Sequence, residues 1–204
     1  MGVKVLFLDY DGVIADSMGA KAEALADAFA PYTQDRAGVA DGFRRHAGSG
    51  RELIFDRIYE DLIGAPLDET TRQRILRVFL ARIDAINAAI GLFPGVQGFI
   101  EAQAAKRTVA VVTGVPQEEA QRQLERLGLA PFLASVHGAT RETPKHIHMG
   151  RFLEARTIAP ADALFVGDSH ADMHEAALAG IPFVGIGEAA FFAEGTPLAV
   201  LPSL

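Results

Sequence analysis

The feature that most restricts the fold is a regular alternation of short apolar segments with segments of helical periodicity. Five runs rich in Val, Ile, Leu and Phe are expected to be buried strands, at residues 4–8, 108–112, 134–136, 163–166 and 183–186. In the second half of the chain, helices are expected between these runs; one of them follows Pro116 and ends at Gly128. Strands and helices that alternate at this spacing form βαβ units, so the sequence predicts a parallel, Rossmann-like α/β sheet.

Residues 16–90 differ from the rest of the chain because they contain no convincing strand. Four amphipathic helices are expected there, at residues 18–30, 35–46, 51–63 and 68–90, and Pro94-Gly95 follows the last of them. An all-helical block of about 75 residues between the first and second strands is typical of an inserted subdomain. We therefore expect an α/β core made of residues 1–15 and 91–204, and a helical cap made of residues 16–90.

The amino-acid composition limits the cell compartments and the binding partners that we expect for this chain. The 204 residues carry a formal net charge of −7 and include no Cys, which excludes disulfides, thiolate metal sites and a Cys nucleophile. The acidic balance, without a basic run, argues against nucleic acid and anionic membranes as partners. No apolar stretch reaches the length of a membrane span, and the apolar run at residues 3–8 is too short for a signal peptide. We expect a cytoplasmic protein.

Carboxylates follow two of the predicted strands at the point where each strand ends. Asp9 and Asp11 come after the first strand, and Asp168 comes after the fourth. The carboxyl ends of parallel strands share one edge of the sheet, so these side chains should converge there. Two carboxylates about 4 Å apart repel by roughly 4 kcal/mol at an effective dielectric constant of 20, and a bound cation removes that repulsion. Oxygen ligands favour Mg²⁺. The alternative is a turn with solvated carboxylates.

Other polar residues are placed to join this cluster. Thr113 and Gly114 follow the second strand, and Lys145 starts a helix, where a cation is unfavourable unless an anion is bound nearby. Lys145 is one of only four lysines in the chain, which suggests a phosphate contact; an ordinary exposed lysine is the alternative. Asp172 lies in the first turn of the helix after Asp168, where helix capping is the alternative role.

The order of these residues resembles the haloacid dehalogenase superfamily of phosphatases and mutases, and the resemblance covers nearly the whole chain. The helical block resembles the cap of the branch that contains phosphoglycolate phosphatase and β-phosphoglucomutase. Val13 and His146 depart from the usual Thr and Pro of the motifs. The resemblance rests on four motifs: Asp9-Tyr10-Asp11-Gly12-Val13, Val111-Val112-Thr113-Gly114, the region of Lys145, and Val166-Gly167-Asp168-Ser169-His170-Ala171-Asp172.

The resemblance implies roles for the motif residues. Asp9 would be the nucleophile that forms an aspartyl-phosphate, and Asp11 would exchange protons with the leaving group and with water. Asp9, the Asp11 backbone carbonyl and Asp168 would bind Mg²⁺. The phosphoryl oxygens would be held by Thr113, Gly114 and Lys145, and Asp172 would orient Lys145 or a water on the metal. Since dehalogenase members lack an acid at the position of Asp11, its presence indicates phosphoryl chemistry.

The expected activity is Mg²⁺-dependent hydrolysis of a small phosphorylated metabolite, such as a sugar phosphate or a related organic phosphate. Arg51, in Gly48-Ser49-Gly50-Arg51, resembles a cap arginine that contacts substrate in mutase relatives, although a solvated helix face is the alternative. Three other functions remain open at this point: a phosphomutase, a receiver-like phospho-switch and a phosphonate hydrolase. The last of these would need a cap lysine that forms a Schiff base, and Lys21 is the cap's only lysine.

Overall fold

The computed structural model describes residues 2–140, 142–192, 195 and 197–204, and within them six parallel strands form one sheet in the order β3-β2-β1-β4-β5-β6. The strands are β1 (Val5–Leu8), β2 (Thr108–Thr113), β3 (Ser135–Gly138), β4 (Ala163–Gly167), β5 (Phe183–Ile186) and β6 (Ala199–Leu201). β1 lies between β2 and β4, with Leu8 opposite Val111 on one side and Val166 on the other. The sheet and its βα connections confirm the predicted α/β fold class.

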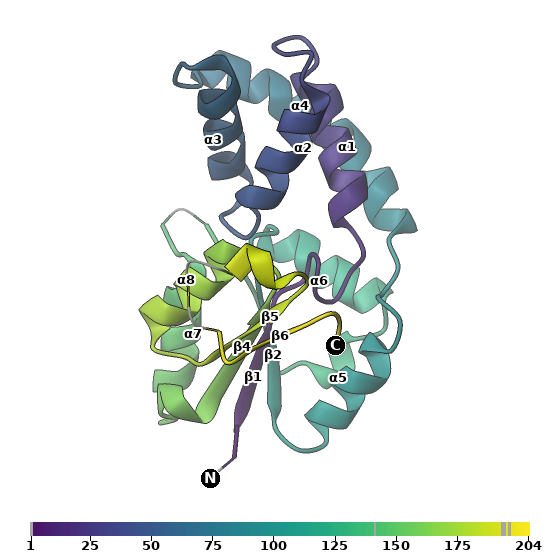
Figure 1. Cartoon of the computed structure of the whole chain (residues 1–204). Coiled ribbons are helices and arrows are strands. Elements are labelled where there is room, and N and C mark those ends of the chain that lie inside the picture. Colours follow the sequence, from purple (N-terminus) through teal and green to yellow (C-terminus); the bar gives the residue numbers. More distant parts are fainter. Residues whose placement is uncertain (1, 141, 193–194, 196) are drawn as a thin grey trace.

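Four helices of the core cover the two faces of the sheet (Figure 1). They are α5 (Val96–Ala104), α6 (Gln117–Arg126), α7 (Lys145–Glu154) and α8 (His170–Ala179). Leu6 and Leu8 pack in a cluster with residues of α5 and α6, whereas Val5 and Phe7 pack in another with residues of α7 and α8. Because β1 is apolar on both faces, it occupies the buried centre of the parallel sheet.

Four further helices form a separate bundle between β1 and α5, which we call the cap. They are α1 (Met18–Phe29), α2 (Arg36–Arg45), α3 (Arg51–Ile63) and α4 (Glu69–Ala89). The bundle has its own apolar core, in which the ring of Phe55 lies edge-on to those of Phe29 and Phe79. Figure 1 shows the bundle above the carboxyl ends of the strands. The division into core and cap at residues 15/16 and 90/91 stays a proposal.

Strand β6 and helix α5 were not predicted from the sequence. β6 has only three residues and forms the edge of the sheet beside β5, and α5 connects the cap to β2. The remaining strands lie within one or two residues of the predicted runs. In the described part of the chain, no helix combines the length and the apolar character that crossing a membrane requires.

Candidate active site

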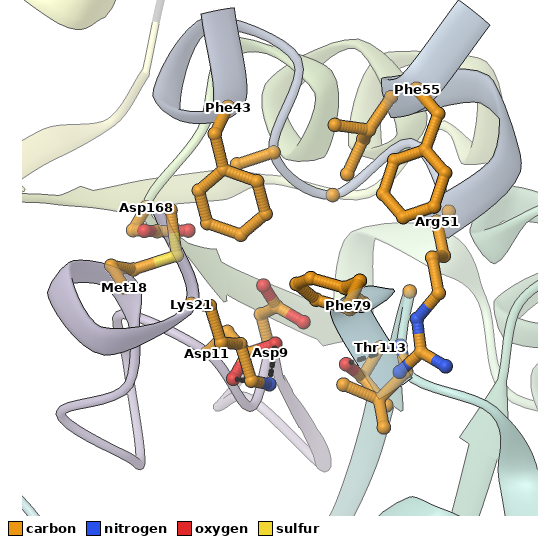
Figure 2. A pocket seen from close by; sticks show the side chains of 16 residues that line it. Asp9, Asp11, Met18, Lys21, Phe43, Arg51, Phe55, Phe79, Thr113 and Asp168 are labelled. Atoms are coloured by element: carbon orange, nitrogen blue, oxygen red, sulfur yellow. Dashed lines mark hydrogen bonds and ion pairs between the residues drawn. The ribbon is translucent and has the colours of Figure 1, made fainter. Parts of the chain in front are cut away.

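A pocket lies between the ends of the strands and the cap. Its floor belongs to the core and includes Asp9, Asp11 and Asp168, together with Thr113 and Gly114 at the end of β2. Its walls belong to the cap and include Met18, Lys21, Phe43, Arg51, Phe55 and Phe79 (Figure 2). The cavity volume of the pocket is about 50 Å³. The structure therefore brings the predicted floor residues together.

Asp9 is the most deeply buried carboxylate of the pocket floor. It directly follows β1, and its backbone N–H donates to the Val166 carbonyl, which fixes it against β4. Burial raises the pKa of Asp9 to about 7, and the neighbouring carboxylates of Asp172 and Asp11 act in the same direction. Lys145 acts in the opposite direction, because its Nζ lies 2.9 Å from Asp9 Oδ1. The site holds more buried negative charge than this one lysine neutralises.

Lys145 joins Asp9 to Asp172 beneath the pocket. Its side chain is 1% exposed, and Nζ lies 2.5 Å from Asp172 Oδ1 as well as near Asp9. Burial by itself would lower the pKa of Lys145, but Asp172 and then Asp9 outweigh it and raise the pKa above its usual value. The other carboxylate oxygen of Asp172 accepts from Ser169 Oγ at 2.6 Å. Both oxygens of Asp172 are therefore engaged, and Lys145 is held as an ammonium ion.

His146 stands where the motif usually has Pro, and Lys145 next to it contacts both Asp9 and Asp172. Unlike Pro, His146 has a backbone N–H, and this group donates to Glu175 Oε2 at 2.7 Å; His146 Nδ1 lies 2.8 Å from the same oxygen. Glu175 on α8 thus binds the first turn of α7, next to Lys145. Val13, the other departure, is buried in the apolar core cluster next to α5 and α6.

Asp168 follows β4 and faces Asp9. Burial, and then the charges of Asp9 and Asp172, raise the pKa of Asp168 well above its ordinary value. Asp168 Oδ1 is buried and has no hydrogen-bond partner among the described residues. A Cβ on Gly12 would lie 1.9 Å from Asp168 Oδ2, so only glycine, whose φ is +77°, allows this approach. One oxygen each from Asp9, Asp168 and Asp172 lies within 4.8 Å of the others.

The loop of residues 48–50 brings the cap backbone into contact with the core. A Cβ on Gly114 would lie 3.1 Å from the Gly50 N atom, and a Cβ on Gly48 would lie 2.8 Å from Ser169 Oγ. Gly48 and Gly50 have φ values of +84° and +86°, which side-chain-bearing residues rarely adopt. The glycines that the sequence placed beside Arg51 therefore allow this loop to lie between two of the motifs.

Arg51 lines the pocket, and its guanidinium also joins the cap to the core. Arg51 Nη2 lies 2.9 Å from Glu119 Oε2 on α6, and the guanidinium carbon lies 5.3 Å from the ring centre of Phe79. Glu119 Oε1 accepts from Asn87 Nδ2 on α4 at 2.9 Å. Asn87 and Glu119 were not predicted to have roles, since residues so far apart in sequence share no local pattern.

Lys21 is the contact of Asp11 that the sequence missed. Lys21 Nζ lies 2.6 Å from Asp11 Oδ1 and 2.8 Å from Asp11 Oδ2 (Figure 2). The Ser17 hydroxyl donates to Asp11 Oδ1 as well. Lys21 and Ser17 are both buried. The sequence places Lys21 in the first turn of a predicted cap helix. An exposed lysine can occupy the same position, so the sequence does not indicate that Lys21 is buried.

The site thus places a buried carboxylate beside a second carboxylate and a lysine at the carboxyl ends of the strands, beneath the helices of the cap. The family described as haloacid dehalogenase-like hydrolase matches residues 5–186, and the chain belongs to this family. This membership removes the receiver-like alternative.

Several relatives of this chain are named as phosphatases. The chain is 31% identical over 195 residues to a phosphoglycolate phosphatase of Rhodospirillum rubrum, covering 89% of this chain and 78% of the relative. It is 27% identical to a phosphoglycolate phosphatase of Mesorhizobium japonicum, covering 91% and 83%. Among solved structures, a predicted phosphoglycolate phosphatase from Haemophilus somnus has a TM-score of 0.81 at 22% identity, covering 98% and 94%, which supports the fold.

Proposed function

We propose that the protein is a Mg²⁺-dependent phosphatase that hydrolyses a small phosphorylated metabolite through an aspartyl-phosphate. The observation that carries the proposal is Asp9, buried at the pocket floor beside Asp11 and in contact with the ammonium group of Lys145. The phosphatases among the relatives support the same reaction.

The two carboxylates on the pocket floor divide the reaction between them. An Asp9 oxygen attacks phosphorus, the bond from phosphorus to the leaving oxygen breaks, and that oxygen receives a proton from Asp11. Water then attacks the phosphorus of the aspartyl-phosphate and gives a proton to Asp11, and the Asp9 carboxylate is released with inorganic phosphate. Thr113 and the Gly114 amide lie on the same floor and would hold phosphoryl oxygens. Lys145, which lies beneath the pocket floor, partly neutralises the negative charge of Asp9.

The donor set fits Mg²⁺. Asp168 Oδ1 is a buried oxygen without a hydrogen-bond partner in the described residues, next to the Asp9 carboxylate. Asp9, Asp168 and the Asp11 backbone carbonyl would hold the ion, which when bound reduces the repulsion between the carboxylates and a phosphate dianion. Although Asp172 belongs to the same cluster, Lys145 and Ser169 engage both of its oxygens, so its role is to orient Lys145.

The cap residues that line the pocket would contact the part of the substrate beyond its phosphate group. We propose that the substrate is a small sugar phosphate or a related organic phosphate. Phe43, Phe55 and Phe79 supply apolar surface, and Arg51 supplies a cation that can contact an anionic group of the substrate. Arg51 already forms an ion pair with Glu119. To contact the substrate, its guanidinium must therefore either bind Glu119 and the substrate at the same time or release Glu119. Among organic phosphates, we expect those with a short body and one additional anionic group to be the best substrates.

The test is a phosphate-release screen over phosphorylated metabolites and an aryl phosphate, with Mg²⁺ and with a chelator. We expect metal-dependent release, and no release with the Asp9→Asn protein, whose fold is checked by circular dichroism. The absence of metal-dependent release from every substrate would refute the phosphatase, and near-full activity of Asp9→Asn would refute the nucleophile. Phosphoryl return to a bisphosphorylated substrate, instead of release, would identify the phosphomutase alternative.

A further inference from the structure

Lys21 is a buried cation of the cap whose charged group faces the core. It lies in the first turn of α1, and its side chain is 5% exposed. Nζ contacts both oxygens of Asp11, at 2.6 and 2.8 Å, and lies 5.7 Å from the ring centre of Tyr10. A lysine is almost never buried to this extent unless it is paired. The pairing therefore explains the burial, and its partner is the carboxylate to which the proposed reaction assigns proton exchange.

Stability alone is a weak reason for such a pair. The cost of removing two charged groups from water offsets most or all of their attraction. A pair of apolar residues of similar volume therefore often gives the folded protein the same stability. Geometry is the better explanation, because three contacts from Lys21 and Ser17 converge on one carboxylate. Together they fix the rotation and the position of the Asp11 side chain at the pocket floor.

Orientation of this carboxylate matters for the chemistry. A proton donor acts only within hydrogen-bond distance of the leaving oxygen, and small misplacements lower the rate strongly. Among the described residues, Lys21 is the cap cation that forms an ion pair with a carboxylate of the pocket floor, since Arg51 pairs with Glu119 on α6 instead. The cap thus supplies part of the geometry of the proton-transfer group.

We propose that Lys21 is a positioning residue: it holds the Asp11 carboxylate in the orientation that accepts a proton from the bound phosphate monoanion and passes it to the leaving oxygen. This inference rests on the proposed phosphatase activity. It makes a prediction about leaving groups, because a basic alkoxide needs that proton, whereas 4-nitrophenolate leaves with little need of it. Loss of Lys21 should therefore damage the hydrolysis of alkyl phosphates more than that of 4-nitrophenyl phosphate.

The experiment compares the full-length wild type, Lys21→Met and Lys21→Arg on 4-nitrophenyl phosphate and on the best alkyl phosphate of the screen. For Lys21→Met we expect kcat on the alkyl phosphate to fall roughly 10- to 100-fold, with a much smaller fall on 4-nitrophenyl phosphate. Lys21→Arg keeps a cation that can bind both carboxylate oxygens, so it should recover part of the loss. The exposed Lys106 provides a control: Lys106→Met should retain wild-type kinetics.

Equal losses of Lys21→Met on both substrates would overturn the proposal, and so would wild-type kinetics. A rise in KM with kcat unchanged on both substrates would also overturn it, since Lys21 would then bind substrate. If Lys21→Met does not fold, Lys21→Arg and Lys21→Gln are compared in the same way. Failure of the proposed function itself would be visible separately, because the wild type would then release no phosphate from either substrate.

Discussion

Protons and Mg²⁺ should compete for the carboxylates of the pocket floor. With a pKa of about 7, Asp9 is about 3% ionised at pH 5.5 and about 90% ionised at pH 8. Because a metal ligand must be deprotonated, the affinity for Mg²⁺ should rise about 30-fold between these pH values, which corresponds to about 2 kcal/mol of binding free energy. The raised pKa of Asp168 adds to the same trend.

The stability of the metal-free protein should change in the opposite direction. The pKa of Asp9 is about 7 in the folded protein and 3.8 in the ordinary reference, so between those values the folded state binds more protons than the unfolded state. The stability that Asp9 contributes is therefore present below about pH 4 and is lost as the pH rises through 7. Mg²⁺ should offset this loss, since it binds the ionised carboxylates.

Two measurements on the purified protein test both statements. Isothermal titration calorimetry with Mg²⁺ at pH 5.5, 6.5 and 8 measures the affinity, and thermal unfolding with a chelator or with saturating Mg²⁺ measures the stability. For a chain of this length, about 2 kcal/mol corresponds to a difference of about 4–8 °C in the Mg²⁺-induced Tm shift between pH 5.5 and pH 8. Asp9→Asn is the matched control, because its neutral amide should flatten most of the pH dependence. An affinity independent of pH in the wild type, or an unchanged dependence in Asp9→Asn, would refute the reasoning.

Three further predictions concern the surroundings of the pocket floor. Lys145→Met leaves two buried carboxylates without their cation, so we expect a loss of about 3–5 kcal/mol in the free energy of unfolding by urea; an unchanged value would contradict the ion pairing. Arg51→Ala and Glu119→Ala should be coupled by about 1 kcal/mol in a double-mutant cycle of unfolding, and additive effects would show that the pair contributes no interaction energy. Gly114→Ala places a methyl group 3.1 Å from the loop of residues 48–50 and should lower kcat/KM about tenfold, whereas Gly98→Ala, whose added methyl meets nothing within 4 Å, should not.

The sequence predicted the parts of the molecule that local patterns determine. Buried parallel strands give continuous apolar runs, and four of the five predicted runs match their strands within about a residue at each end. The ends of these strands then place Asp9, Thr113 and Asp168 at one edge of the sheet, as observed. β6 was missed because a strand of three residues at the sheet edge has too few alternating positions to produce a pattern.

Contacts between the cap and the core could not be predicted in the same way. They depend on where the helical bundle lies above the sheet, and periodicity determines only which face of each helix is buried. Arg51 was a candidate substrate contact because its loop resembles that of mutase relatives, but its partner Glu119 lies 68 residues away on the first turn of a core helix. Glu119 looked like an ordinary acidic residue at a helix start, a place that favours it in any case.

Lys21 shows why the site is larger than its motifs. We considered Lys21 from the sequence only as a potential Schiff-base lysine for phosphonate chemistry. Its Nζ instead contacts both oxygens of Asp11, so this group is engaged with a carboxylate and is not free to attack a carbonyl carbon. The same contact that argues against phosphonate hydrolysis gives the proton-transfer carboxylate a fixed position. In the proposed mechanism, the core supplies the reacting groups, and the cap supplies both the wall around the substrate and Lys21, which orients Asp11.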